Sequence, residues 1–157
     1  MKIGKKNLIL NEIGAQMEEC IFCNIIDKKS KAYIVYEDEN TIAFLDISPV
    51  FLGHTLIVPK KHYVTVMEAP KEVLESIADD VKFISEAVMK ATGSEGIMVV
   101  NNNIVSQLVH HLHVHIIPRN FGDKFSYPRG PRRRYTEEHM NEIKEKIKSE
   151  IATIKNN

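Results

Sequence analysis

The sequence lacks the features that mark several classes of protein. Its 157 residues contain no tryptophan and two cysteines, and 21 basic residues (Lys and Arg) balance 21 acidic ones (Asp and Glu). A chain of zero formal net charge has no overall field that attracts nucleic acid or an anionic membrane, so any anion site must be local. Two cysteines 3 positions apart also do not suit the disulfide framework of a small secreted domain.

Long apolar segments are missing as well. No run approaches the ~20 apolar residues that cross a bilayer. The basic start at 1–6 leads into an apolar stretch, 7–11, that is too short for the core of a signal peptide. We therefore expect a cytoplasmic protein without membrane contact, of a length that suits one domain with a full hydrophobic core.

The apolar pattern that is present predicts both strands and helices. Apolar residues spaced by three and four predict a long helix over 72–90, with Pro70 suited to its first turn and Gly93 after it, and a C-terminal helix over 137–154 capped by Thr136. A short helix is expected within 18–26. Runs rich in β-branched and aromatic residues predict five strands, over 33–37, 41–45, 55–59, 97–100 and 107–117. The last of these is the histidine-rich stretch, which Pro118 is expected to end. This order indicates an α+β fold around a mostly antiparallel five-stranded sheet, with one long helix and a C-terminal helix.

The chain divides into three parts by composition. Residues 1–16 form an N-terminal extension, 17–125 the main domain, and 126–157 an arginine-rich segment followed by the C-terminal helix. Within 127–135, four arginines stand between two prolines and two tyrosines. Guanidinium groups can clasp the phosphates of a bound ligand. The alternative is a solvated loop or a dimer contact, and the balanced charge elsewhere does not favour nucleic-acid binding.

Three histidines alternate with aliphatic residues near the end of the main domain. Because successive side chains of a strand point to opposite faces, His111, His113 and His115 should form one row, backed by the apolar row Leu112, Val114 and Ile116. Neighbouring imidazoles can divide labour, one attacking an electrophile while the other stabilises charge or moves a proton. A phosphorus centre is a suitable target, because its displacement mostly needs positioning and charge neutralisation.

The stretch from Gln107 to Pro118, with Val109 and the alternating histidines, resembles the signature of the histidine triad (HIT) family of nucleotide hydrolases and transferases. The likeness covers about 18–119 and implies the HIT-like fold and a homodimer. In that family the middle histidine, here His113, attacks the α-phosphorus of a nucleotide, and water resolves the nucleotidyl-histidine. By resemblance, His115 and Gln107 hold the phosphate.

The resemblance also implies a nucleotide pocket. Asp46 matches the carboxylate that receives the ribose hydroxyls, and Asn101 matches a phosphate-side asparagine, although a plain turn residue is an equal interpretation. His54 matches a histidine beside the active site, either supporting the imidazole of His113 or serving only the fold. The base is expected against apolar residues that can equally be ordinary core: Phe22, Ile25, Phe44, Ile47 and Leu56.

Two departures concern the turn before the triad. The Hint branch of the family has Gly-Gln-Ser where this chain has Ser106, Gln107 and Leu108, and the turn after Asn101 is shorter by at least one residue. Glycine would allow a close approach of the backbone to a phosphate. Leu108 lacks the hydroxyl donor of serine, so the departures bear on the leaving group and the rate.

The pair Cys20 and Cys23 has the spacing of a metal clip, a redox dithiol or a simple buried pair. Zinc-bearing relatives in the superfamily complete such a site with two histidines, which match His62 and His111 here. That resemblance implies a closed, structural zinc site of two cysteines and two histidines that braces the triad strand.

The expected function is therefore a nucleotide phosphoramidase or dinucleoside polyphosphate hydrolase, acting on a purine nucleotide through a nucleotidyl-histidine. The alternatives are a nucleotide-binding module with little turnover, and a protein that processes nucleic-acid ends with its arginine segment.

Overall fold

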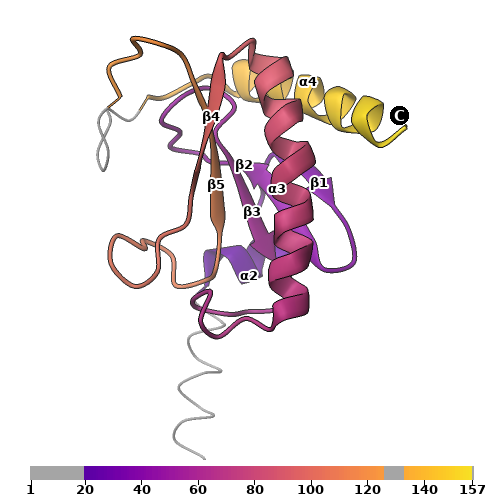
Figure 1. The fold of residues 1–157 in the computed structure, drawn as a ribbon, viewed down its shortest axis with the longest axis vertical. Helices are drawn as coiled ribbons and strands as arrows, with labels where there is room; N and C mark the ends of the chain where they lie inside the picture. The colour runs from indigo at the N-terminus through magenta and orange to yellow at the C-terminus, as the bar shows by residue number, and fades with distance from the viewer. Residues whose placement is uncertain (1–19, 126–132, 157) are drawn as a thin grey trace, which may run out of the picture.

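A computed structural model describes residues 20–125 and 133–156. Five strands form one antiparallel sheet in the order β1-β2-β3-β5-β4 (Figure 1). Every neighbouring pair is antiparallel, as the sequence predicted. The strand bounds are β1 Ile34–Glu37, β2 Thr41–Leu45, β3 Thr55–Pro59, β4 Gly96–Val100 and β5 Val114–Arg119.

Within the described residues, three helices pack on this sheet: α2 (Ile21–Ile26), α3 (Lys71–Thr92) and α4 (Glu137–Lys155). The predicted stop of α3 is confirmed, because Gly93 ends it in the left-handed region (φ 65°) that glycine adopts without strain. We expected Pro70 in the first turn of this helix, and it is instead the N-cap, one residue before the helix begins. The predicted cap of α4 is confirmed too, since the Thr136 hydroxyl accepts a hydrogen bond from the His139 amide.

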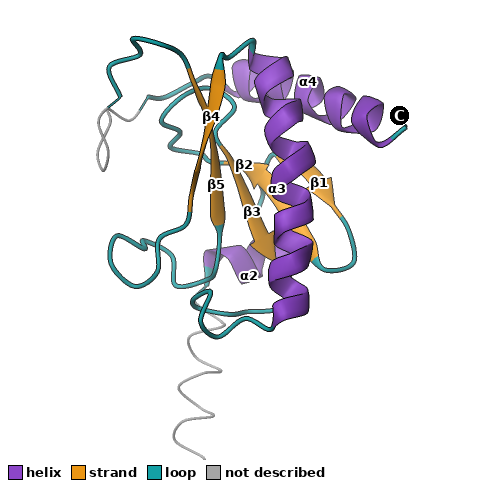
Figure 2. Cartoon of the chain, viewed as in Figure 1, coloured by secondary structure: helices purple, strands orange, loops and turns teal. Residues whose placement is uncertain are grey.

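The sheet is covered on both faces. Helices α3 and α4 share one hydrophobic cluster with the sheet, and α2 shares a second (Figure 2). All five residues of β2 are buried for this reason: Ala43 and Leu45 face the α3–α4 cluster, while Ile42 and Phe44 face α2. The alternation of β2 and β3 therefore defines two sides of the molecule.

The histidine stretch follows the same alternation. Leu112, Val114 and Ile116 all belong to the α3–α4 cluster, which sends the intervening histidines to the α2 side. The predicted strand bounds were wrong at both ends. Regular strand pairing of β5 begins only at Val114, because the residues before it make other contacts. Pro118 does not end the strand but lies inside β5, opposite Ile97.

A buried carboxyl lies between the sheet and α3. Asp80 is 3% exposed and accepts a hydrogen bond from the Thr41 hydroxyl, and burial raises its pKa from 3.8 to about 6. Between these two values the folded protein binds more protons than the unfolded chain, so stability falls as the pH rises from about 4 to about 6. A shift of about two pKa units corresponds to a penalty of about 3 kcal/mol, fully present above pH 6.

We expect Asp80→Asn to raise the free energy of unfolding at pH 8 by about 2 kcal/mol, since the amide oxygen can still accept from Thr41 while the charge is gone and the new NH₂ offsets part of the gain. The difference from the wild type should shrink to near zero at pH 4. Urea titrations at both pH values measure it, and a variant no more stable than the wild type at pH 8 would contradict the account.

Candidate functional site

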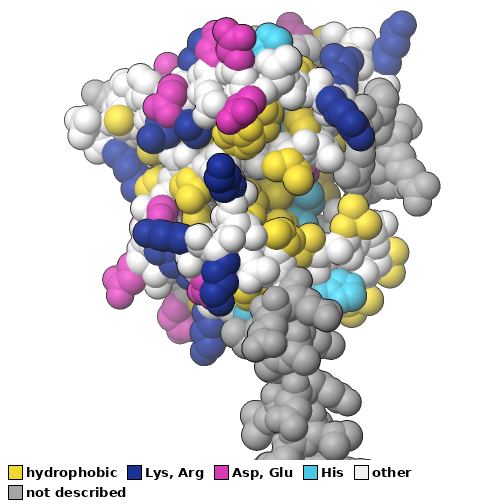
Figure 3. All heavy atoms as spheres, turned by 180° about the vertical axis from the view of Figure 1, so that it is seen from behind, with side chains coloured by type: hydrophobic (Ala, Val, Ile, Leu, Met, Phe, Trp, Pro, Cys, Tyr) yellow, Lys and Arg dark blue, Asp and Glu magenta, His cyan; other side chains and the backbone are white. Residues whose placement is uncertain are grey.

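The three histidines of the triad lie in one row on the α2 side of the sheet. The His113 and His115 ring centroids are 4.8 Å apart, and the Phe22 ring of α2 stands edge-on to His113 at 5.2 Å and to His111 at 6.0 Å. Figure 3 shows histidine side chains at the floor of a hollow bordered by hydrophobic side chains. The predicted row is therefore present, and each member has different partners.

His113 is held as a neutral imidazole with one free nitrogen. Its Nδ1 lies 2.6 Å from the carbonyl oxygen of His111, which can only accept, so Nδ1 carries the proton and Nε2 carries the lone pair. Burial lowers the pKa of His113 below its usual 6.5, and the ring is 4% exposed. His113 thus has the protonation state of a nucleophile at neutral pH.

His115 and His54 form the next pair. The Val50 amide donates to His54 Nδ1 (3.3 Å), so the proton of His54 is on Nε2, which lies 2.9 Å from His115 Nδ1. His115 Nδ1 therefore accepts, and its own proton is on Nε2. We expected His54 either to support His113 or to serve only the fold. The ring that it contacts here is that of His115, and support of His113 stays a prediction.

Asp46 lies at the end of this chain of rings. One carboxylate oxygen accepts from the Ser48 amide (2.7 Å), and the other lies 3.7 Å from His54 Nδ1. The side chain is 21% exposed, which leaves it accessible to hydroxyl donors. Ile47, expected beside the base, is 78% exposed on the same loop.

The other residues expected around the base are buried together. Phe22 and Phe44 meet edge-to-face at 5.4 Å, and the cluster includes Ile25 and Leu56. This packing shows that the four side chains belong to the hydrophobic cluster under α2. Contact with a nucleotide base stays a prediction.

Two polar residues expected near the phosphate bond to the backbone in this structure, and their contact with a phosphate stays a prediction. The Gln107 amide NH₂ donates to the Val64 carbonyl (2.6 Å) and its oxygen accepts from the Ile104 amide (2.8 Å). Asn101 donates to the carbonyl oxygen of His113 (2.7 Å). Both therefore position the turn and the triad in this structure, and their polar groups are already engaged.

The turn between β4 and the triad is strained. Ile104 (φ 68°) and Ser106 (φ 63°) occupy the left-handed region, which glycine adopts freely and a β-branched residue rarely does. Ser106 stands where the Hint branch has glycine, so a residue with a side chain occupies a position whose backbone conformation favours glycine.

The arginine segment lies largely outside the described residues. Arg133, which is described, donates its backbone amide to the Pro49 carbonyl (3.2 Å), and its guanidinium lies 5.5 Å from the centre of the Phe51 ring. The end of this segment is therefore attached to the loop that carries Asp46.

Cys20, Cys23, His62 and His111 come together as the sequence suggested, with one ligand atom of each within 4.8 Å of the others. His111 Nε2 donates to the Pro59 carbonyl (2.9 Å), which leaves the lone pair of Nδ1 facing Cys20 Sγ (3.5 Å) and Cys23 Sγ (3.6 Å). His62 Nδ1 lies 3.2 Å from Cys23 Sγ. A tetrahedral zinc ion separates a cysteine sulfur from a histidine nitrogen by about 3.6 Å, so the group fits that metal.

The electrostatics of this group suit a metal too. Burial lowers the pKa of His111 to about 4 and raises that of Cys23 to about 12. The imidazole is neutral and ready to bind at pH 7, whereas the thiol must give up its proton to the solvent on binding. The group can therefore hold a metal, with affinity that falls as the pH is lowered.

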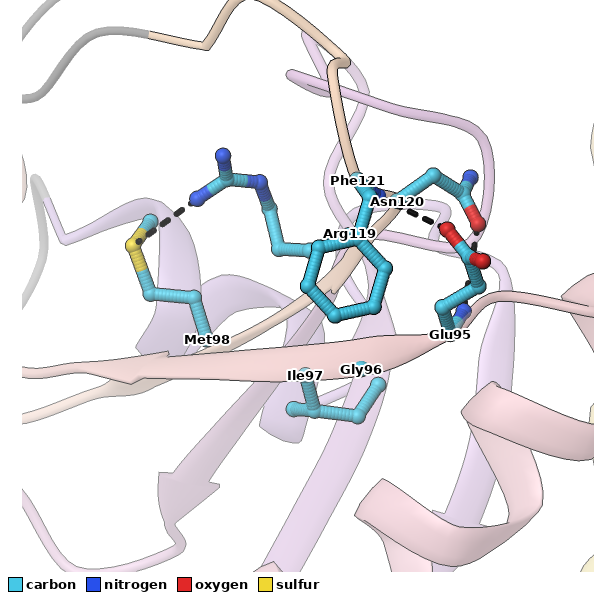
Figure 4. Close-up of a pocket in the computed structure, with 7 residues that line it drawn as sticks. All are labelled: Glu95, Gly96, Ile97, Met98, Arg119, Asn120 and Phe121. Atoms are coloured by element: carbon cyan, nitrogen blue, oxygen red, sulfur yellow. Dashed lines mark hydrogen bonds between the residues drawn. The ribbon is translucent and has the colours of Figure 1, made fainter.

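A shallow pocket lies apart from these residues, at the end of β4 (Figure 4). Its rim includes Arg119, which donates to the Met98 sulfur (3.7 Å), and Phe121, which is 91% exposed. The Phe121 amide donates to Glu95. None of the predicted catalytic, nucleotide-binding or metal residues lines it.

Several contacts that define the site had no signal in the sequence. The tautomers of His54 and His111 depend on the backbone of Val50 and Pro59, and any residue type offers those groups. No sequence pattern predicted the attachment of Arg133 to the 46–53 loop either.

Comparison with known proteins identifies the family. The HIT domain model matches residues 27–122. An uncharacterized HIT-like protein of Methanocaldococcus jannaschii is 50% identical over 106 residues, covering 66% of this chain and 81% of that protein. The adenylylsulfatase HINT3 of Arabidopsis thaliana is 40% identical over 114 residues, 71% of this chain and 58% of that protein.

The fold agrees with solved structures of the family. A zinc-bound histidine triad family protein from Mycobacterium smegmatis superimposes with a TM-score of 0.79 at 31% identity, covering 89% of this chain and 98% of that one. With a matched domain model, similar sequences and a similar fold in agreement, the chain belongs to the HIT family.

Proposed function

We propose that the protein is a nucleotidyl hydrolase that releases a nucleoside monophosphate from its substrate through a covalent intermediate on His113. The observation that carries the proposal is the 2.6 Å contact between His113 Nδ1 and the His111 carbonyl. It fixes a neutral imidazole whose Nε2 lone pair is available for attack on phosphorus.

In the first step, His113 Nε2 forms a bond to the α-phosphorus while the bond from phosphorus to the leaving group breaks. The imidazole becomes cationic, and the His111 carbonyl stabilises the proton that stays on Nδ1. The Nε2 proton of His115 can donate to a phosphate oxygen, and His54 holds the His115 ring in that tautomer.

In the second step, water attacks the phosphorus, its proton passes to solvent, and His113 departs as a neutral imidazole. The ribose hydroxyls would be received by Asp46, and a purine base would lie over the apolar residues under α2. Relatives include a named adenylylsulfatase, which supports a substrate with a nucleotidyl group. A dinucleoside polyphosphate fits the same scheme because its leaving group departs as an anion, and a phosphoramidate fits it when the departing amine takes up a proton from the solvent as the bond from phosphorus to nitrogen breaks.

The metal that we propose at the Cys20 group is zinc. It would supply structural cross-linking, because all its positions are filled by protein ligands. Its ligand His111 is the residue whose carbonyl orients His113, so the metal site would brace the nucleophile. The zinc-bound relative from Mycobacterium smegmatis supports this choice.

A homodimer paired along β4 is also proposed. This strand is one edge of the sheet, and Val99 on it is 49% exposed. The opposite edge strand, β1, lies under α4, whose Lys155 donates to the Tyr36 hydroxyl. The open edge is therefore the one available for pairing with a second copy.

The test is to trap the intermediate. The protein is mixed with an adenosine phosphoramidate, adenylyl sulfate and a diadenosine polyphosphate, quenched under denaturing alkaline conditions that preserve phosphohistidine, and digested for mass spectrometry. We expect adenosine monophosphate as product and an adenylyl group on His113. Binding without product would indicate the nucleotide-binding module instead, and an adenylyl group on another residue would contradict the assignment.

A further inference from the structure

The nucleophile lies just outside the regular sheet. The strand pairs nearest to it are Ile57 with Val114, between β3 and β5, and Val100 with His115, between β4 and β5. Strand β5 begins at Val114, so no pair of these described strands includes His113. The backbone that carries the imidazole therefore needs other contacts to hold the ring in place.

A chain of three hydrogen bonds reaches this backbone from the segment before α3. The Val66 amide donates to Asn103 Oδ1 (2.9 Å), and the Asn103 NH₂ donates to Asn101 Oδ1. The Asn101 NH₂ donates in turn to the His113 carbonyl (2.7 Å). Both asparagine side chains are half-buried, where hydrogen bonds are stronger than in bulk water.

The two ends of this chain allow only one direction of donation. The Val66 amide can only donate, so the oxygen of Asn103 faces it and the NH₂ of Asn103 faces Asn101. That NH₂ requires the oxygen of Asn101, which leaves the NH₂ of Asn101 for the His113 carbonyl, a group that can only accept. The side chain of Asn103 thus determines which way the Asn101 amide points.

The same segment before α3 also supports the triad at two other points. The Leu112 amide donates to the Tyr63 carbonyl (2.6 Å), and the Gln107 NH₂ donates to the Val64 carbonyl (2.6 Å). These contacts hold the turn and the start of the histidine row. The contact through Asn103 is the one that continues to the backbone of the nucleophile.

Resting on the hydrolase function above, we propose that Asn103 is a positioning residue for the nucleophile. It acts through Asn101 and not on the reacting atoms. By fixing the direction of the Asn101 amide, it gives the His113 carbonyl a donor and holds the peptide that carries the imidazole. Attack on phosphorus is sensitive to this placement, because an error of about 1 Å can cost about 10²-fold in rate.

Two substitutions separate the direction of the chain from a simple loss of contact. Asn103→Asp keeps an oxygen for the Val66 amide but replaces the NH₂ with a second acceptor. The NH₂ of Asn101 should then turn toward the carboxylate, and its oxygen should meet the His113 carbonyl, acceptor against acceptor. Asn103→Ala removes the side chain and leaves the Asn101 amide able to keep its bond to His113.

The readouts are the maximal single-turnover rate of adenylyl transfer to His113 and the substrate concentration that gives half of it, with the substrate of the panel above that yields most product. We expect Asn103→Asp to lower the rate at least about tenfold and Asn103→Ala about threefold. The half-saturating concentration should change less than about twofold in both, because substrate binding is not altered. A side chain that served only the fold would not give this order, since aspartate retains more contacts than alanine.

A double-mutant cycle with Asn101→Ala tests the route and controls for the added charge. If Asn103 acts through the Asn101 amide, Asn103→Asp should change the rate less than about twofold in a protein that already lacks this amide. A carboxylate that acted directly on the His113 ring would lower the rate in both backgrounds. Urea titrations give the folded fraction of every variant, and the rates are normalised to it.

Four results would overturn the proposal. They are equal losses of rate in the two Asn103 variants, a loss below about tenfold in Asn103→Asp, a further loss of about twofold or more when Asn103→Asp is added to Asn101→Ala, and a change confined to the half-saturating concentration. Absence of product from the wild type would remove the hydrolase function and this role with it. Product formed through His113 together with any of the four results would remove the role of Asn103 alone.

Discussion

Replacing His113 with alanine is expected to lower kcat by a factor of about 10⁴ or more, because it removes the atom that bonds to phosphorus. Positioning of a water molecule by the remaining groups can supply only residual turnover. Release of adenosine monophosphate under single-turnover conditions measures the effect separately from product release. The trapped adenylyl-protein should disappear in the same variant.

The matched control is His110→Ala. His110 is the neighbouring histidine, and it is exposed and outside the row. Its loss should change kcat less than about twofold and leave the unfolding midpoint in place. Because the His113 ring is 4% exposed, His113→Ala creates a small cavity and should lower stability by about 1–2 kcal/mol, so thermal melts of both variants belong with the assay. Retained turnover in a folded His113→Ala protein would remove the covalent mechanism.

The acid limb of the same reaction gives a second view of His113. Since burial lowers its pKa, half of the nucleophile is protonated only at a pH below 6.5, the ordinary value for histidine, and the acid midpoint of the kcat/KM profile should lie below 6.5 as well. An imidazole with the ordinary pKa would already have lost half of its reactive form at pH 6.5. An acid midpoint at 6.5 or above would therefore contradict a lowered pKa for His113.

The sequence was sufficient where residue spacing alone determines the structure. The alternation of Leu112, Val114 and Ile116 predicted the buried row of β5, and spacings of three and four predicted α3 and α4 to within a few residues. The four candidate metal ligands were named from the spacing of the two cysteines and from the resemblance to zinc-bearing relatives, and the structure brings all four together.

The sequence was insufficient where a structural feature depends on which hydrogen-bond partner a polar side chain has in the fold. No sequence pattern indicated that two backbone groups bond to both ends of the Gln107 amide. None indicated that His54 contacts His115. These contacts join segments distant in the chain, and no local periodicity reports them. Pro118 was misjudged for a similar reason. The pairing of β5 with β3 ends at Ile116, so Pro118 has a paired strand only on the β4 side, and a proline is tolerated at such an edge position.

Removal of the metal is expected to have the largest effect on stability. A ligand present at ~1,000 times its dissociation constant stabilises the folded state by about 4 kcal/mol, which corresponds to a fall in Tm of about 10 °C for a domain of this size once it is removed. Dialysis against a zinc chelator, followed by calorimetry and metal analysis of the same sample, measures both quantities. Re-addition of zinc should restore the Tm.

Cys23→Ser provides the control for this experiment. The variant should contain little zinc, melt near the chelated wild type, and show no further response to chelator. Chelation should also reduce kcat, because the proposed zinc would hold His111, whose carbonyl oxygen orients His113 at 2.6 Å, and a mobile His111 would no longer fix the proton on Nδ1. A fully metal-free protein with an unchanged Tm would show that the four side chains form a packed cluster rather than a metal site. If chelation lowered kcat and left the Tm unchanged, the metal would act only on the orientation of the nucleophile and not on the stability of the fold.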